Sequence, residues 1–457
     1  MRQFDVAVVG GGPGGYVAAI KAAQSGKNVC LIEQGKLGGV CLNRGCIPTK
    51  SILKSIDVLH TVKHCAEYGI EGLHSQQVSI KMGLVQQRKN SIVQKLTGGV
   101  GQLLKANKVT VLTGSAAFID KNTLIVGTEE IGAAHIIIAT GSKPFLPPIP
   151  QSGSVPLITS DEALEIADVP ANVVIVGGGV IGVEFAYIFG SLGSRVTVIE
   201  LMDRILPMVD EEITTEVAKL LKNVGVNIVT GAKVASFDGT SVAYELEGAS
   251  HIVQGDIILM ATGRVPNTEG LNLECLNLKM NGRAIATDAA MKTSIPGIYA
   301  IGDVNGQSML AHTASMEGIV AVENILGKSS TIDYSKIPWC IYLQPEIAAV
   351  GLTEKQAREQ YEEVKVGRFP LSANGKALVE GETKGIVKVI IEPKYNEILG
   401  VHIYGIHATD MIAEVVLAMT LEATAEEIAV TVHPHPTVSE VIPEAFHAAL
   451  HKAIHAI

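Results

Sequence analysis

The sequence predicts an α/β protein in which one parallel-sheet unit occurs twice and an α+β unit follows. Two observations predict the repeated unit. Residues 6–33 and 173–200 both read as apolar strand, glycine turn, helix and second apolar strand, and each landmark recurs 167 residues later. A third observation predicts the last unit, because apolar residues alternate with polar ones at 385–393 and 397–405, as in antiparallel strands. We expect two Rossmann-like domains and a C-terminal α+β domain.

Composition supports a folded, acidic, multidomain chain. Its 457 residues suggest roughly three domains at about 150 residues each. The formal net charge of −10 argues against a general binder of nucleic acid or anionic membranes, because both need a basic face. Glycine is frequent, with 47 residues, but 47% of the chain is hydrophobic and 18% is charged, which excludes disorder.

The apolar runs are too short to cross a membrane. The longest, such as 173–183 and 257–262, fall short of the roughly 18 residues that a spanning helix requires. Residues 1–5 lead directly into a strand, which leaves no room for a targeting segment. Six cysteines form no disulfide framework, so a reducing compartment is expected. We expect a cytoplasmic protein, or an organellar matrix protein if the chain has been processed.

The two glycine turns match a dinucleotide-binding fingerprint. The first glycine makes the tight turn, the second lets backbone approach a pyrophosphate, and the third allows close helix–strand packing. An acid that ends the second strand can accept hydrogen bonds from a ribose. Each copy contains all four residues, with the acid 18 positions after the third glycine: Gly10, Gly12, Gly15 and Glu33, then Gly177, Gly179, Gly182 and Glu200. A purely structural glycine turn is the alternative, but two complete copies predict two dinucleotides.

A second, shorter repeat, which we call the Ala-Thr-Gly echo, predicts how the nucleotide-binding regions are completed. Segments 135–144 and 256–267 each end an apolar strand with Ala-Thr-Gly, which suits a turn beside a cofactor or a plain strand-ending turn. The proline-rich segment 144–150 suits a boundary. The predicted regions are 1–150 and 151–270 for the two nucleotide-binding domains, 271–336 for a segment that completes the first, and 337–457 for the α+β domain.

Cys41 and Cys46 follow the first repeat within a glycine-rich segment. In a regular helix their Cα atoms would be roughly 9 Å apart, whereas a disulfide tolerates at most about 7 Å. A bond between them therefore requires irregular backbone, which Gly38, Gly39 and Gly45 allow. Such a small loop would stabilise the fold by only about 2 kcal/mol, so a redox pair is favoured over a structural disulfide. Two unbonded core thiols and half of a metal site are the alternatives. The other cysteines (Cys30, Cys65, Cys275 and Cys340) are expected to be packing residues.

His435 stands between two prolines, which restrict its backbone and suit a positioned side chain. Glu440 could accept a hydrogen bond from one ring nitrogen and so fix the tautomer for acid–base work. A capped turn before a helix is an equally good interpretation of this motif on its own.

Taken together, the two dinucleotide motifs, the GGVCLNRGCIPTK segment (38–50) and the HPHPTVSE segment (433–440) resemble the disulfide-reductase flavoproteins over the whole chain. Within that family the chain is similar to the dihydrolipoamide dehydrogenases. The resemblance implies an enzyme that oxidises protein-bound dihydrolipoamide through a Cys41–Cys46 disulfide and FAD and reduces NAD⁺ to NADH. It implies as partners the lipoyl domains of 2-oxo acid dehydrogenase complexes or the H protein of glycine cleavage.

The resemblance also assigns site residues. The first repeat would bind FAD with its glycines and Glu33, with Lys50 near the flavin and Asp303 on the ribityl chain; backbone contacts would come from Gly114, Thr140, Gly141 and Ala311. The second repeat would bind NAD, from Gly177 to Glu184 and at Glu200; its pocket would be completed by Val234 and Gly263. Glu200 would repel a 2′-phosphate and so favour NAD over NADP.

The same resemblance assigns the catalytic roles. Cys46 would face the flavin, Cys41 would exchange with the substrate, and His435, held by Glu440, would be the acid–base group. His435 would act on the site of the partner subunit, which makes a homodimer necessary and the C-terminal domain its interface. No metal is expected. A reductase of another disulfide, a transhydrogenase-like flavoprotein and a non-catalytic subunit of a larger complex are the rival interpretations.

Overall fold

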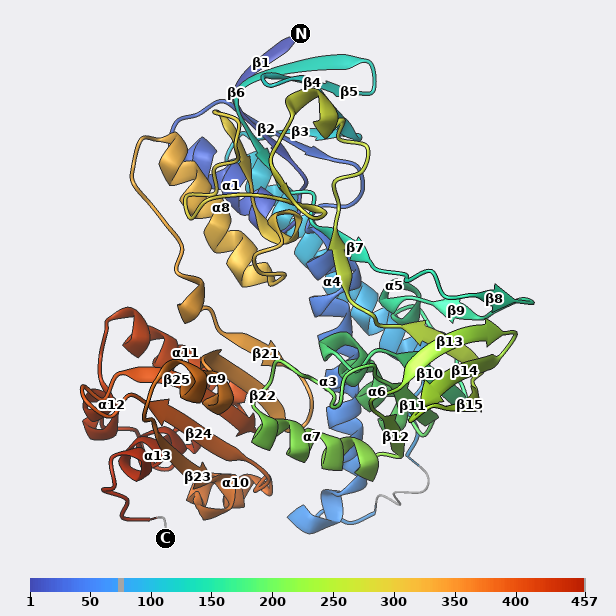
Figure 1. Cartoon of the computed structure of the whole chain (residues 1–457), viewed down its shortest axis with the longest axis vertical. Helices are drawn as coiled ribbons and strands as arrows, with labels where there is room; N and C mark the ends of the chain where they lie inside the picture. Colours follow the sequence, from blue (N-terminus) through green and yellow to red (C-terminus); the bar gives the residue numbers. More distant parts are fainter. Residues whose placement is uncertain (73–77, 456–457) are drawn as a thin grey trace. The chain divides into compact units, whose positions relative to one another are not determined.

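The computed structural model describes residues 1–72 and 78–455 (Figure 1). Its contacts divide the chain into two compact units, each described by itself below. The first comprises Met1–Pro148, Leu157–Val169 and Leu259–Asp333, and the second comprises Ile149–Pro156, Pro170–Ile258 and Tyr334–Ile457. One break falls within the proline-rich segment 144–150. The division into four regions at 150, 270 and 336 stays a prediction.

The first unit is built on a sheet with the strand order β3-β2-β1-β6-β5-β4, to which β20 adds at β6. Strands β3, β2, β1, β6 and β20 are parallel neighbours, whereas β4 and β5 pair antiparallel. Val and Ile dominate β1, β2 and the end of β6 because both faces of such strands are covered. The strands are β1 (Arg2–Val9), β2 (Val29–Glu33), β3 (Thr110–Thr113), β4 (Ala116–Asp120), β5 (Thr123–Val126), β6 (Glu129–Ile138) and β20 (Ile298–Ala300).

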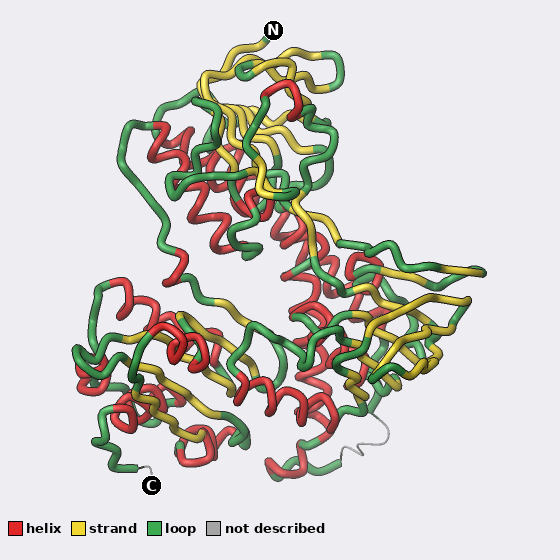
Figure 2. Tube along the Cα trace, viewed as in Figure 1, coloured by secondary structure: helices red, strands yellow, loops and turns green. Residues whose placement is uncertain are grey.

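Helices cover this sheet, and two of them cross at glycines. A Cβ atom at Gly14 would lie 2.8 Å from the carbonyl oxygen of Ala314, and one at Gly318 would lie 2.7 Å from that of Gly14. Only glycine therefore allows α1 and α8 to approach this closely. Helices α3 and α4 also pack against each other (Figure 2). The helices are α1 (Pro13–Gln24), α2 (Gly39–Arg44), α3 (Cys46–Lys63), α4 (Met82–Ala106), α5 (Ser160–Ala163) and α8 (Ala311–Ile325).

Short elements complete the first unit. They are η1 (Cys65–Tyr68), β7 (Ser142–Pro144), β9 (Leu157–Ile158), β17 (Arg264–Pro266), η3 (Leu273–Leu276), β18 (Met280–Asn281), β19 (Ala284–Ile285) and η4 (Gly302–Asn305). Helix α8 is followed by Gly327 at φ +82°, a conformation that glycine adopts without strain.

The second unit repeats the first nucleotide fold in a sheet that includes the order β12-β11-β10-β16. Strands β10, β11 and β12 are parallel, and β13, β14 and β15 form an antiparallel sheet with β8 at its edge. These elements are β8 (Gln151–Ser152), β10 (Asn172–Val176), α6 (Val180–Ser191), β11 (Arg195–Ile199), α7 (Glu211–Asn223), β12 (Val226–Val229), β13 (Lys233–Asp238), β14 (Ser241–Leu246), β15 (Ala249–Gln254) and β16 (Ile257–Met260).

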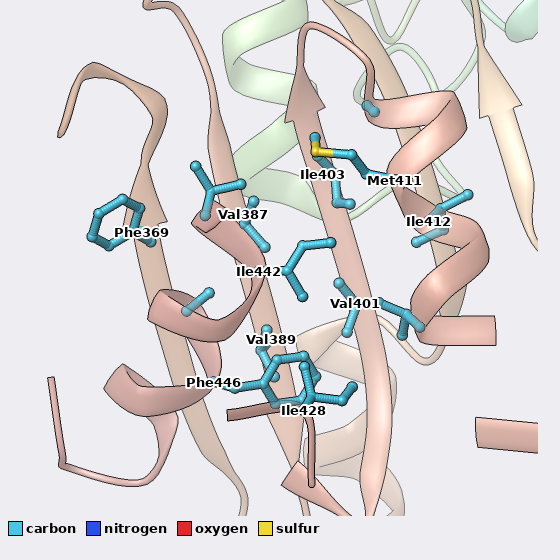
Figure 3. Packing of buried hydrophobic residues seen from close by; sticks show 14 of the residues in the cluster. Phe369, Val387, Val389, Val401, Ile403, Met411, Ile412, Ile428, Ile442 and Phe446 are labelled. Carbon is cyan, nitrogen blue, oxygen red and sulfur yellow. The ribbon is translucent and has the colours of Figure 1, made fainter. Parts of the chain in front are cut away.

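The C-terminal part of the second unit is an antiparallel sheet in the order β21-β22-β25-β24-β23. Alternate residues of β24 and β25, such as Val387, Val389 and Val401, pack with Ile442 and Phe446 of α13 in one core (Figure 3). The elements are η5 (Tyr334–Lys336), β21 (Trp339–Ile341), β22 (Glu346–Gly351), α9 (Glu354–Gln360), β23 (Lys365–Pro370), η6 (Leu371–Ala373), α10 (Gly375–Glu380), β24 (Ile386–Ile391), β25 (Ile398–Gly405), α11 (Ala408–Thr420), α12 (Ala425–Val430), η7 (Val438–Glu440) and α13 (Val441–Ala449).

The predicted α+β texture of this part is confirmed. Helix α11 begins at Ala408, directly after His407 at φ +58°. The expectation that the remaining cysteines are packing residues is wrong for Cys275, which is exposed; Cys30 and Cys65 are buried.

Candidate active site

The first glycine turn has the backbone that its motif requires. Gly10 adopts φ +111°, and a Cβ atom there would lie 2.2 Å from the carbonyl oxygen of Ala139. A Cβ atom at Gly15 would lie 1.9 Å from the carbonyl oxygen of Gly10. Helix α1 then starts after Gly12 with no acidic residue in its first turn, so its positive N-terminus is unopposed. This turn fits a pyrophosphate.

The second turn repeats this geometry closely. Gly177 adopts φ +110°, and Gly179 precedes α6 at φ −74° and ψ −174°, against φ −72° and ψ −175° for Gly12 before α1. A Cβ atom at Gly179 would meet no atom within 4 Å, so the backbone faces open space there. Gly182 is buried inside α6. The same backbone fits the same phosphate chemistry, as two dinucleotides require.

The two predicted ribose acids also support their own turns. Glu33 accepts hydrogen bonds from the backbone N–H groups of Gly11 and Gly35, each at 2.7 Å. Glu200 accepts from those of Gly178 at 2.5 Å and Met202 at 2.8 Å. Each carboxylate oxygen therefore holds one N–H group and keeps a second lone pair for a ligand hydroxyl. Sequence reasoning assigned only the ligand contact.

The cysteine pair spans a break between two helices. Cys41 lies in α2 and Cys46 begins α3, and Gly45 between them adopts φ −149° and ψ −113°, outside helical geometry. The irregular backbone that a bond between them requires is therefore present. Both are thiols in this structure. Their sulfurs are close enough for a side-chain hydrogen bond, and this bond, burial and the negative charge of Cys46 all raise the pKa of Cys41 above its ordinary value.

The two sulfurs have different surroundings. Cys46 is the first residue of α3, where the helix N-terminus stabilises an anionic sulfur. Lys50, one turn further along α3, lowers the pKa of Cys41 through its charge, but not enough to overcome Cys46. Cys46 is exposed and Cys41 is half-buried.

Helix α2, which carries Cys41, contacts the first glycine turn directly. Gly39, at φ +59°, lies so close to the turn that a Cβ atom would be 2.6 Å from the Cα atom of Gly12. The N–H of Gly38 also donates to the carbonyl oxygen of Gly11 at 2.8 Å. The structure thus brings together two motifs that lie more than twenty residues apart in the sequence.

The remaining residues predicted for FAD lie on four further segments of the first unit. Gly114, at φ +151°, donates from its N–H to the carbonyl oxygen of Glu33 at 3.0 Å, beside the ribose acid. Thr140 and Gly141 follow β6, with Gly141 at φ +70°. Asp303 lies in η4, and Ala311 is the first residue of α8. Their contacts with FAD stay a prediction.

The residues predicted for NAD are placed as follows. Glu184 is buried in α6 and accepts from the N–H of Tyr342 at 3.0 Å. Val234 lies at a bulge of β13, where the register with β14 shifts. Gly263 adopts φ +106° and belongs to the first unit by its contacts. Their contacts with NAD likewise stay a prediction.

His435 and Glu440 are paired as expected. Nδ1 of His435 lies 2.9 Å from Oε1 of Glu440, so Nδ1 carries the proton and Nε2 is the basic nitrogen. The imidazole is 80% exposed. Oε2 of Glu440 accepts from the N–H of Thr437 at 2.9 Å, so this glutamate also caps a turn before α13. Burial would raise the pKa of Glu440, but the Thr437 and His435 hydrogen bonds lower it.

The nearby His433 is engaged differently. Its Nε2 lies 2.9 Å and 3.1 Å from the two carboxylate oxygens of Glu414, and its Nδ1 lies 3.0 Å from the carbonyl oxygen of Thr431. The side chain is only 7% exposed. Since both ring nitrogens face acceptors, neither is left for a substrate, and the geometry selects His435 from the motif.

Several residues around the cysteine pair were missed. Arg44, between the two cysteines, forms an ion pair with Asp161 at 3.0 Å. Ser142 and Arg264 contact the segment that carries Asp303. Ser142 and Arg264 belong to the first and second Ala-Thr-Gly echoes, so the sequence drew attention to both segments, but nothing in the pattern marked Asp161.

Comparison with known proteins decides the family. A family model described as pyridine nucleotide-disulphide oxidoreductase matches residues 4–318, and the dimerisation domain of the same family matches residues 337–446. The chain belongs to the pyridine nucleotide-disulphide oxidoreductases. The predicted fold class and family are confirmed.

Individual relatives agree over the whole chain. A dihydrolipoyl dehydrogenase of Bacillus subtilis is 43% identical over 99% of both chains, and one of Geobacillus stearothermophilus is 42% identical over all of this chain and 98% of the relative. The solved Cu(II) complex of the HOCl-induced flavoprotein disulfide reductase RclA from Escherichia coli is 30% identical, with a TM-score of 0.86 over 98% of this chain and 99% of that chain.

As a pyridine nucleotide-disulphide oxidoreductase, the chain is a flavoprotein that uses FAD and NAD(H), and it carries a dimerisation domain. Within residues 1–72 and 78–455, no helix is both long and apolar enough to span a membrane. Nor do three or more potential metal-ligating His, Cys, Asp or Glu side chains gather anywhere in that described part.

Proposed function

We propose that this oxidoreductase oxidises protein-bound dihydrolipoamide to lipoamide and reduces NAD⁺. The observation that carries the proposal is the hydrogen-bonded Cys41–Cys46 pair, set across a helix break and against the Gly12 turn. The dihydrolipoyl dehydrogenase relatives at 41–43% identity over almost the whole chain support this substrate.

The dithiol exchange uses residues of this chain. His435 of the partner subunit removes a proton from a substrate thiol, and the resulting thiolate attacks Cys41 of the oxidised pair. The Cys41–Cys46 bond breaks, and Cys46 leaves as a thiolate stabilised at the start of α3. The second substrate thiol then loses its proton as its sulfur attacks the substrate sulfur bonded to Cys41. That bond to Cys41 breaks, and Cys41 takes up a proton and leaves as a thiol. One disulfide has formed in the substrate, and two electrons remain on the cysteine pair. FAD held at the first glycine turn would supply the acceptor for this electron pair, and NAD⁺ held at the second turn would supply the final hydride acceptor.

The two cysteines have different roles in the proposed exchange. The raised pKa of Cys41 keeps its thiol protonated after exchange, whereas Cys46 carries the charge. Glu440 supports the base by holding Nδ1 of His435, which directs Nε2 to the substrate. Glu200 places a carboxylate at the second turn and so disfavours the 2′-phosphate of NADP.

We further propose that the dimerisation domain forms a homodimer and that lipoyl domains of 2-oxo acid dehydrogenase complexes or the glycine-cleavage H protein are the partners. The bacterial relatives support a cytoplasmic location. Co-purification of the native protein from its own source would identify the lipoyl-bearing complex.

A disulfide acceptor assay tests the substrate. Purified protein is given NADH with lipoamide, glutathione disulfide or a trypanothione-like disulfide, and NADH loss is followed by absorbance. We expect lipoamide to be reduced most efficiently. The second candidate is a reductase of another disulfide, which the likeness to RclA favours. Preference for a different acceptor would establish that candidate instead, and purified protein without flavin absorbance would contradict both.

A further inference from the structure

We propose that Ser142 and Arg264 are positioning residues of the FAD site and that they act through Asp303. The inference rests on the proposed function and deepens it, because Asp303 is the residue assigned to the ribityl chain. A hydrogen-bonded path joins these three residues, which lie on segments far apart in the sequence.

The path begins where the two Ala-Thr-Gly echoes meet. Strands β7 and β17 follow the two echoes and pair antiparallel with each other. The hydroxyl of Thr140 donates to the carbonyl oxygen of Asn267 at 2.6 Å, and that of Thr262 donates to the carbonyl oxygen of Phe145 at 2.7 Å. The threonine of each Ala-Thr-Gly segment thus donates a hydrogen bond to the residue just after the strand that follows the other segment. We call this pair of segments, 140–145 and 262–267, the clasp.

Ser142 and Arg264 project from the clasp toward η4. Arg264 donates from Nε to the hydroxyl oxygen of Ser142 at 2.7 Å and from Nη2 to the Ser142 carbonyl oxygen at 2.9 Å. The Ser142 hydroxyl hydrogen-bonds to Oδ2 of Asp303. Since Arg264 only donates and an ionised carboxylate only accepts, the serine proton must point to Asp303. The path therefore has one direction, from cation to hydroxyl to carboxylate.

This path sets the side chain of Asp303, while a separate contact sets its backbone. The N–H of Gly302 donates at 2.5 Å to Oε2 of Glu317, which is completely buried in α8. Gly302 itself adopts φ +71°. With the backbone held by Glu317 and Oδ2 held by Ser142, the carboxylate has a fixed orientation in which Oδ1 serves as the acceptor for a ligand hydroxyl.

The charge of Arg264 suits this role. Burial lowers the pKa of Arg264, and the charges of Asp303, Asp161 and Cys46 oppose that effect. A guanidinium remains cationic under these conditions. It therefore stabilises the Asp303 carboxylate, which is partly buried behind Ser142, itself only 6% exposed.

The experiment measures the release of FAD from the purified holoenzyme, followed by the fluorescence of freed flavin. Ser142→Ala is expected to speed release roughly tenfold, because hydrogen bonds to a charged group are about 1.5 kcal/mol or stronger. Arg264→Lys should shift release in the same direction, since lysine keeps the charge but not both hydrogen bonds. Ser194→Ala is the matched control: Ser194 is buried and donates at 2.7 Å to the carbonyl oxygen of Pro170 in the second unit, and we expect unchanged release.

A double-variant cycle separates positioning from general destabilisation. In an Asp303→Asn background the serine no longer has a carboxylate to orient, so adding Ser142→Ala should change release by less than twofold. Equal acceleration in both backgrounds, or acceleration by Ser194→Ala as well, would overturn the inference. These outcomes leave the disulfide acceptor assay unaffected, whereas wild-type protein without flavin would contradict the proposed function itself.

Discussion

At the scale of single residues, chemically alike side chains are separated by their contacts. Cys41 and Cys46 have the same thiol group, but the hydrogen bond to Cys46, burial and the charge of Cys46 raise the pKa of Cys41. His433 and His435 are two positions apart, but His433 has acceptors at both nitrogens and His435 only has Glu440 at Nδ1 among the hydrogen bonds seen here. Within each pair, different contacts therefore give two identical side chains different chemical surroundings.

Cys46→Ser is expected to abolish the long-wavelength absorbance that a thiolate forms with flavin on reduction, while FAD stays bound. The reason is that the proposed exchange leaves the negative charge on Cys46, since the hydrogen bond to Cys46, burial and the charge of Cys46 raise the pKa of Cys41. Cys41→Ser is the matched control and should retain a thiolate–flavin band. An unchanged band in Cys46→Ser would contradict this division of roles.

His435→Ala is expected to lower turnover with dihydrolipoamide by roughly 10²–10⁴-fold, the usual contribution of an acid–base group. His407→Ala serves as the control, because His407 also pairs with a glutamate, Glu380, at 3.2 Å in the same domain and has no role in the proposed exchange. Steady-state kinetics with saturating NAD⁺ measures both. A loss below tenfold for His435→Ala would reject the assignment.

At the scale of elements, the redox helix α2 is placed by glycine contacts. Gly39 in α2 packs against Gly12, and a Cβ atom at Gly39 would lie 2.6 Å from the Gly12 Cα atom, so position 39 admits no side chain. The break at Gly45 then lets α3 restart with Cys46 at its N-terminus. The position of the cysteine pair beside the FAD turn thus depends on backbone packing as well as on the cysteines.

Gly39→Ala is expected to destabilise the protein by about 1–3 kcal/mol and to lower its flavin content. A Cβ atom at φ +59° is strained, and it would lie 2.6 Å from the Gly12 Cα atom. Thermal unfolding and the flavin-to-protein absorbance ratio measure the two effects.

Gly98→Ala in α4 is the matched control for this prediction. A Cβ atom there meets no atom within 4 Å, so alanine should stabilise the helix by about 0.5–1 kcal/mol. Equal stability of Gly39→Ala and the wild-type protein would contradict the packing argument.

At the scale of the whole molecule, a buried ion network joins helix α7, in the nucleotide-binding part of the second unit, to the antiparallel sheet that contains β24. Lys388 of β24 lies 2.8 Å from Asp210, the N-cap of α7, and 2.9 Å from Glu354 at the start of α9. The side chains of Lys388 and Asp210 are 4% and 3% exposed. Arg368 adds further bonds to Glu212 and Glu354. A buried network of this kind fixes the second unit internally.

Lys388→Met is expected to destabilise the protein by about 3–5 kcal/mol, because it leaves buried carboxylates without their cation. Lys376→Met is the control: Lys376 forms a half-exposed pair with Glu380 at 3.0 Å, and the expected loss is about 0–1 kcal/mol. Thermal unfolding of the flavin-loaded proteins measures both. Similar midpoints for the two variants would contradict the prediction.

The stability of the wild-type protein and that of the Lys388→Met variant should depend on pH in different ways. Burial would raise the pKa of Asp210, but Lys388 lowers it below its ordinary value. A lowered carboxyl pKa stabilises the fold above the ordinary carboxyl range, and this contribution is lost as pH falls through the folded-state value. The stability gap between wild type and Lys388→Met should therefore narrow on acidification below about pH 4. A gap that widens would rule out this linkage.

The sequence by itself determined the parts that depend on local periodicity and on residue type. It predicted the two dinucleotide turns, the antiparallel strands β24 and β25, and the need for irregular backbone between Cys41 and Cys46. Each follows from a short segment, since a glycine at positive φ or a period of two residues is a local constraint. The pairing of His435 with Glu440 was also predicted, because only five residues separate them.

Only the tertiary structure decided which distant segments meet. No local pattern reveals that Gly39 touches Gly12, that Ser142 bridges Arg264 and Asp303, or that Lys388 lies between Asp210 and Glu354. These contacts depend on how strands pair and helices cross, which fixes distances between residues without leaving a periodic trace in either segment. Single residue types such as serine or lysine serve many structural ends, so their partners become visible only in the folded chain.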